Sequence, residues 1–140
     1  MYKKILVPTD GSDFAKKAQS QALFLAKVSG AEIIALSVSE NHFINGISAT
    51  EEVEQLNQIL TDRCKQDLEE FEDMNEDGIK ISSVIKEGTP AKAILEVASE
   101  EEIDLIVIGS SGKSGFDRFI LGSVSDKVVN AAKCPVLVVH

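Results

Sequence analysis

Five short apolar runs alternate along the chain with longer segments whose apolar residues recur at helical spacing. The runs cover residues 4–8, 32–38, 79–86, 105–108 and 135–139. Runs of this length that are rich in Val and Ile are typical of strands buried on both faces. The run at 79–86 differs because polar residues alternate with its isoleucines, which predicts a strand near an edge of the sheet.

The segments between these runs predict four helices. The second, at about residues 50–75, has one apolar and one largely acidic face. Cap residues mark most of the other helix ends. For the first helix these are an N-cap at Ser12 or Asp13 and a C-cap at Gly30, and for the third an N-cap at Thr89 followed by Pro90. The fourth helix has an N-cap at Ser123, and its pattern ends at Ala132.

Strands that alternate with helices predict a parallel sheet with right-handed crossovers and helices on both faces. The expected fold is therefore a single doubly wound α/β domain over residues 1–140, with five strands and four helices. No linker or internal repeat divides the chain.

Composition removes several classes of function. The net charge of −9 argues against a nucleic-acid partner, because binding a phosphate backbone needs an excess of Lys and Arg, but it leaves room for a small anionic ligand. No apolar stretch approaches the ~20 residues of a membrane span, so we expect a cytoplasmic protein. Cys64 and Cys134 lack metal-ligand spacing and are expected to be reduced, partly buried thiols.

The stretch from 103 to 125 carries the strongest chemical signal. The strand at 105–108 is followed by a loop rich in Gly and Ser, then by a second glycine and the start of a helix. Backbone without Cβ atoms can approach a ligand closely, and free N–H groups at a helix start attract anions, so this is the predicted phosphate site. The loop is Gly109-Ser110-Ser111-Gly112-Lys113-Ser114-Gly115, and Gly122-Ser123 stands at the start of the helix.

Ligands of doubly wound sheets bind at the carboxyl ends of the strands, where the strand order reverses. If the chain winds outward from its first strand and returns on the other side, the first and fourth strands meet there. Their ends carry Pro8-Thr9-Asp10 and Gly109-Ser110. Asp10 suits either an Asx turn or a hydrogen bond to a ribose hydroxyl, whereas Ser123 suits both an N-cap and a phosphate donor.

Two better-known nucleotide motifs are absent. Gly112-Lys113-Ser114 looks like the end of a Walker A loop, but Val107 stands where the leading glycine is required. No Gly-x-Gly-x-x-Gly follows the first strand either. The sequence therefore supports neither a P-loop nucleoside triphosphatase nor a nicotinamide dehydrogenase.

At these residues the chain resembles the ATP-binding branch of the universal stress protein family. The spacing Gly109-x2-Gly112-x9-Gly122-Ser123 fits that branch's Gly-x2-Gly-x9-Gly-(Ser/Thr) signature without a gap. The opening residues 5–12 and the closing residues 134–139 are also similar to those of the family. The resemblance covers the whole chain, and residues 41–77 are its least diagnostic part.

The resemblance implies an adenine nucleotide alpha hydrolase-like sheet of order 3-2-1-4-5 and a homodimer that pairs its last strands, Val136–Val139. It implies that Asp10 holds the ribose or adenine side, that Pro8, Thr9 and Val38 line the base pocket, and that Ile108 and Gly109 abut the nucleoside. It further implies that the phosphates are wrapped by Gly112, Lys113 and Ser114 and bound at the helix start by Gly122, Ser123, Val124 and Ser125. Mg²⁺ or Mn²⁺ would bridge phosphate oxygens rather than bind a protein cluster.

Three functions remain open at this point. The first is an ATP-dependent sensor or regulator whose dimer is read by an unidentified protein partner. The second is a slow, metal-dependent ATP hydrolase or phosphotransferase, although the residues designate no catalytic group. The third is a chaperone-like stress protein that binds no nucleotide. Gly109→Val and Gly122→Val are expected to place Cβ atoms where the ligand or its loop sits, abolishing binding while leaving the fold intact.

Overall fold

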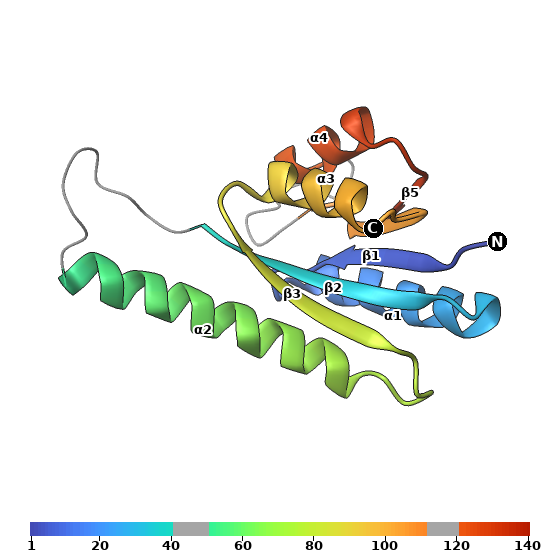
Figure 1. Cartoon of the computed structure of the whole chain (residues 1–140), viewed down its shortest axis with the longest axis horizontal. Helices are drawn as coiled ribbons and strands as arrows, with labels where there is room; N and C mark the ends of the chain where they lie inside the picture. Colours follow the sequence, from blue (N-terminus) through green and yellow to red (C-terminus); the bar gives the residue numbers. More distant parts are fainter. Residues whose placement is uncertain (41–50, 112–120) are drawn as a thin grey trace.

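The computed structural model describes residues 1–40, 51–111 and 121–140 (Figure 1). A five-stranded sheet of order β3-β2-β1-β4-β5 forms its centre, and its four pairs of neighbouring strands are all parallel. The predicted fold class and strand order are therefore confirmed. The elements are β1 (Lys4–Pro8), α1 (Asp13–Ser29), β2 (Glu32–Ser39), α2 (Glu51–Asp73), β3 (Ile81–Glu87), α3 (Pro90–Glu100), β4 (Leu105–Gly109), α4 (Ser123–Ala131) and β5 (Val136–Val139).

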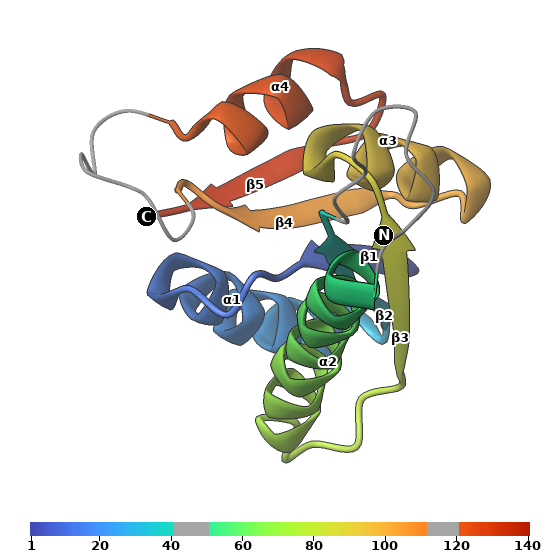
Figure 2. The ribbon, with the colours of Figure 1, turned by 90° about the vertical axis from the view of Figure 1, so that its left-hand side faces the viewer.

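Helices cover both faces of the sheet (Figure 2). One core cluster joins α1 and α2 to the sheet through residues such as Ile5, Ala22 and Phe71, and the other joins α3 and α4 through residues such as Leu6 and Ile94. Neighbouring residues of β1 thus serve opposite cores, as the period of two along a strand requires. This arrangement is why β1, β2 and β4 read as nearly continuous apolar runs.

The caps of α1 form where the sequence predicts them. The Ser12 hydroxyl accepts a hydrogen bond from the Ala15 N–H at 3.2 Å, and Gly30 ends the helix with φ of 76°. Asp13 is the first helical residue, so Ser12 is the cap of the two candidates. Thr89 and Pro90 also stand at the predicted start of α3, but the Thr89 hydroxyl makes no capping hydrogen bond.

The start of α4 differs from the prediction by one residue. Gly122 is the N-cap, with extended φ and ψ of −64° and 162°, and Ser123 is already helical. A serine side chain therefore does not cap this helix. The prediction failed because the cap is decided by backbone dihedral angles, and Gly122 and Ser123 are both common cap residues.

Helix α2 spans 23 residues, yet its buried residues all lie in its second half, at Cys64, Leu68 and Phe71. Its first half projects beyond the sheet (Figure 1). The edge position predicted for the third strand is correct, since β3 ends the sheet and none of its residues is buried. It begins at Ile81, two residues later than the sequence suggests.

Polar groups hold together the amino ends of the strands. The Asp104 carboxylate, just before β4, accepts hydrogen bonds from the backbone N–H of Lys3 at 2.8 Å and of Lys4 at 3.3 Å. Glu32 at the start of β2 lies 3.2 Å from the Lys80 ammonium and 4.0 Å from that of Lys4. These contacts lie at the amino ends of the strands, whereas the predicted site lies at their carboxyl ends.

Candidate functional site

The strand pairing brings the two predicted loop ends together. β1 pairs in parallel with β4, with Ile5 opposite Leu105 and Leu6 opposite Ile106. β1 has β2 on its other side, so the order of connection reverses between β1 and β4. The turn after β1 and the chain after β4 therefore leave the sheet side by side at the topological switch point.

Thr9 is fixed firmly in the turn after β1. It is 6% exposed, and its backbone N–H donates to the Leu36 carbonyl of β2 at 2.8 Å. Its hydroxyl accepts a 2.6 Å hydrogen bond from the side-chain amide of Gln19, which is 2% exposed within α1. The sequence analysis missed Gln19. Its position next to Ala18, on the face that α1 buries, could have indicated a buried polar residue in need of a partner.

Asp10 forms the Asx turn that was one of its two predicted roles. Its Oδ1 accepts a hydrogen bond from the Ser12 N–H at 2.9 Å, and the intervening Gly11 has φ of 78°, which a glycine adopts without strain. Its second carboxylate oxygen accepts no hydrogen bond from the residues that the structure describes. The turn leaves that oxygen available for a ligand hydroxyl.

Gly109 is required by packing rather than by a ligand. A Cβ at this position would lie 2.8 Å from the backbone carbon and 2.9 Å from the carbonyl oxygen of Phe14 in α1. The vacant direction points at the first turn of α1, so Gly109→Val would disturb the fold that it was expected to leave intact, whereas the contact of Gly109 with a nucleotide stays a prediction. The physical reason is the close approach of α1 to the end of β4.

Ser110 lies between β4 and the start of α4. Its backbone N–H donates to Val139 at 2.8 Å, and its carbonyl accepts from the Gly122 N–H at 2.8 Å. Its side chain is fully buried, yet its Oγ has no hydrogen-bond partner among the described residues. A buried hydroxyl without a partner costs free energy of about 1–3 kcal/mol, so it marks a place where a polar group fits.

The first turn of α4 offers backbone donors that have no partner among the described residues. The N–H groups of Ser123, Val124 and Ser125 precede the first intrahelical bond, which runs from Asp126 to Gly122. The Ser125 hydroxyl donates to the Gly109 carbonyl at 2.8 Å, so this predicted phosphate donor also ties α4 to β4. The arrangement suits an anion held by backbone amides at a helix start.

A Cβ on Gly122 would lie 3.3 Å from the Ser111 Cα and 3.6 Å from the Ser110 carbonyl oxygen. That is tight, and it places the added atom against the chain that leaves β4, as the prediction for the loop required. Gly122 therefore keeps the end of β4 and the start of α4 close together.

The apolar members of the predicted site share the α3–α4 face of the sheet. Ile108 belongs to that core, and Val38 and Val124 pack against it while half-buried. Pro8 ends β1 half-buried. The predicted residues Gly112, Lys113 and Ser114 lie outside the described residues.

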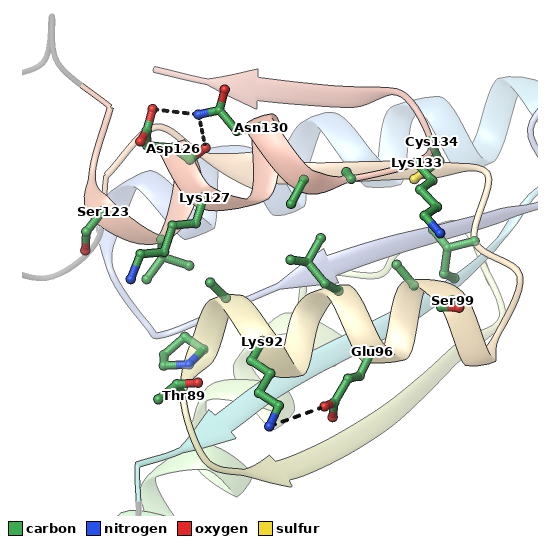
Figure 3. Close-up of a pocket in the computed structure, with 18 of the residues that line it drawn as sticks. Thr89, Lys92, Glu96, Ser99, Ser123, Asp126, Lys127, Asn130, Lys133 and Cys134 are labelled. Carbon is green, nitrogen blue, oxygen red and sulfur yellow. Dashed lines mark hydrogen bonds and ion pairs between the residues drawn. The ribbon is translucent and has the colours of Figure 1, made fainter.

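A groove runs between α3 and α4, with a volume of about 1120 Å³ (Figure 3). We call it the α3–α4 groove. Ser123 and Val124 line its mouth, so it adjoins the predicted site, although most of it extends away from the switch point. Cys134 lines its far end; burial raises the pKa of this thiol, an effect opposed by a backbone hydrogen bond and aided by the charge of Asp104.

Three further findings concern metal ligands, membrane-spanning helices and the cysteines. Among the described residues, no group of three or more His, Cys, Asp or Glu side chains is placed to hold a metal ion. Within the same ranges, no helix combines the length and the apolar character needed to cross a membrane. Cys64 and Cys134 are both free thiols, as the sequence predicts.

An open parallel sheet of this order, with a polar turn and a helix start meeting at its switch point, defines a doubly wound α/β protein. Comparison with known proteins identifies the family. The family model for the universal stress protein family matches residues 1–140, and the chain belongs to that family.

Its relatives include Universal stress protein MJ0531 of Methanocaldococcus jannaschii, which is 40% identical over 99% of this chain and 82% of its own length. Among solved structures, that of the hypothetical protein MJ0577 is similar with a TM-score of 0.86 and 35% identity, covering 99% of this chain and 96% of that one. A universal stress protein in complex with cAMP is similar with a TM-score of 0.76 and 28% identity, covering 99% and 97% of the two chains.

Proposed function

We propose that this chain is an adenine-nucleotide-binding universal stress protein that acts as a dimeric, ATP-dependent sensor. The observation that carries the proposal is the junction of β4 and α4, where Ser110 contacts the start of α4. Among the described residues, neither the Ser110 hydroxyl nor the N–H groups of the first turn of α4 have a hydrogen-bond partner. The similar family member solved with cAMP supports an adenine nucleotide as the ligand class.

In this proposal the phosphates bind at the first turn of α4. The backbone N–H groups of Ser123, Val124 and Ser125 donate to phosphate oxygens, and the positive end of the helix adds to the attraction. The buried Ser110 hydroxyl supplies a further polar contact. Gly112, Lys113 and Ser114 complete the phosphate site, as the family signature implies.

The nucleoside lies toward β1 and β2. Asp10 uses its free carboxylate oxygen for a ribose hydroxyl, while Pro8, Thr9, Val38, Ile108 and Gly109 surround the base and sugar. Mg²⁺ or Mn²⁺ binds through the phosphate oxygens, since hard cations prefer oxygen ligands. The carboxylates and basic groups of the described residues form no arrangement that positions water for attack, so binding rather than turnover is the proposed activity.

Two variants of one residue test the phosphate contact. Ser123→Pro removes the 123 N–H, and proline suits this first helical position because Gly122 before it is extended. Ser123→Ala keeps the N–H and removes only the hydroxyl. A charge-assisted hydrogen bond contributes about 1.5–3 kcal/mol, so Ser123→Pro should weaken ATP roughly 10- to 100-fold by calorimetric titration while adenosine binding stays unchanged.

The starting protein must first be stripped of nucleotide and titrated with ATP and magnesium, and the mixture then checked for ADP. Wild-type ATP affinity in Ser123→Pro would show that the start of α4 does not hold phosphate. Steady metal-dependent ADP formation would favour a hydrolase over a sensor, and absence of any nucleotide binding would overturn the proposal.

A further inference from the structure

The α3–α4 groove is larger than a phosphate site needs. Its volume of about 1120 Å³ is at the upper end of the size of small-molecule sites. Apolar side chains form much of its lining: Ala91, Leu95, Ala98 and Ile103 on one side, with Ala131 and Ala132 on the other. Binding a nucleotide at the switch point leaves this space unexplained.

The groove is continuous with the proposed phosphate site. Ser123 and Val124, whose N–H groups start α4, also line the groove mouth. Thr89 lies across the mouth at the start of α3, and its hydroxyl is not engaged in capping that helix. A substituent on the outermost phosphate of a bound nucleotide would therefore meet the groove directly.

Three lysines (Lys92, Lys127 and Lys133) and three carboxylates (Glu40, Glu96 and Asp126) line the groove, so its positive charges are local rather than general. Lys92 pairs with Glu96 at 3.9 Å, and Asp126 accepts a hydrogen bond from Asn130. Lys127 and Lys133 form no ion pair with any residue in the described ranges. Figure 3 shows Lys127 extending from α4 toward the start of α3 at the mouth, and Lys133 lying at the other end near Ser99.

We infer that the α3–α4 groove binds an extended, mainly apolar arm carried on the terminal phosphate of an adenosine diphosphate. The ligand class is an adenosine diphosphate ester of an amide-containing aliphatic chain, as in a pantetheine-type cofactor. Lys127 neutralises the esterified phosphate, the alanine and leucine side chains contact the arm, and Lys133 or Ser99 donates to a carbonyl near its end. The inference rests on the proposed function, because the nucleotide part anchors the arm.

The probe that isolates the arm is dephospho-coenzyme A, compared with ADP. The two share the adenosine diphosphate, but the ester has one negative charge fewer on its terminal phosphate, so a gain in affinity despite that lost charge reports the arm. Calorimetric titration of the stripped protein should give a dissociation constant for dephospho-coenzyme A about tenfold below that for ADP, since the arm moves from water onto apolar side chains.

A matched pair of variants on α4 locates the arm. Ala131 is exposed and lines the groove, so Ala131→Trp fills that space from the surface without entering the core. Val129, 41% exposed on the same helix, is not part of the lining, and Val129→Trp is the control. Ala131→Trp should reduce dephospho-coenzyme A affinity to that of ADP and leave ADP unchanged, whereas Val129→Trp should keep the tenfold difference.

The outcomes separate the two proposals. ADP binding with no gain from the arm overturns the inference and leaves the nucleotide site standing. A gain that persists in Ala131→Trp also overturns it, because the arm would then lie elsewhere. Failure to bind ADP or ATP at all overturns the proposed function, and the groove inference with it.

Discussion

Single residues at the switch point serve the fold and the site at the same time, and Gly109 shows how. Its missing Cβ allows α1 to approach the end of β4, and its carbonyl oxygen accepts the Ser125 hydroxyl. A substitution at Gly109 therefore disturbs the packing of α1 whether or not it affects the binding of a ligand. Loss of binding in a Gly109 variant would not by itself locate the ligand.

Gly109→Ala should destabilise the protein, because the added methyl group meets backbone atoms of Phe14 that have no freedom to move aside. Overpacking of this kind costs about 1–3 kcal/mol, measurable as a lower free energy of unfolding in denaturant. Gly122→Ala is the comparison, since its Cβ has no neighbour nearer than 3.3 Å. Equal stability losses in the two variants would contradict the packing role of Gly109.

At the scale of elements, α1 is joined to the end of β1 by the buried hydrogen bond from Gln19 to Thr9. Both side chains are nearly inaccessible, and the only other hydrogen bond to the Thr9 hydroxyl from the described residues is a long one of 3.5 Å from the Gly11 N–H. The bond holds Thr9 at the site without contacting a ligand itself.

A double-mutant cycle measures this bond. Gln19→Leu and Thr9→Val should each lower the free energy of unfolding by about 1–3 kcal/mol, because each leaves a buried polar group without its partner. The double variant should be less destabilised than the sum of the two, since both polar groups are then replaced by apolar ones. Additive losses in denaturant unfolding would mean that the two side chains act independently.

The sequence predicts the elements well and the contacts between distant elements poorly. The Ser12 and Gly30 caps follow from local patterns, and the meeting of β1 with β4 follows from a topology rule. The full strand order was implied by the resemblance to the family. The reason for Gly109 does not, because its neighbour Phe14 lies far away in the sequence. Gln19 was missed because a polar residue within a helix usually lies on its solvated face.

The whole molecule leaves one edge of the sheet open in a form suited to self-association. β5 is an edge strand, and its four residues are all apolar. Leu137 is 37% exposed. An apolar edge strand with unpaired backbone groups invites another strand, which supports the proposed homodimer through Val136–Val139.

Leu137→Lys should convert the dimer to a monomer, because a lysine on an edge strand opposes pairing with a second copy. Light scattering coupled to size exclusion would report the change in mass. Val28→Lys, on an apolar residue of α1 that is 65% exposed, controls for the added charge and should remain dimeric. A wild-type protein with the mass of one chain would overturn the proposed dimer.

The parallel order of the strands has a practical consequence for anyone who attaches a label or a fusion partner. β1 begins at the amino ends of the strands, where Asp104 and Glu32 hold the strand starts together. This end of the sheet lies a strand length away from the proposed nucleotide site. β5 leaves the sheet with Val139 opposite Gly109, so whatever follows Val139 emerges beside the proposed site. An attachment before Lys4 leaves the proposed site clear, whereas one after Val139 adds its bulk beside that site.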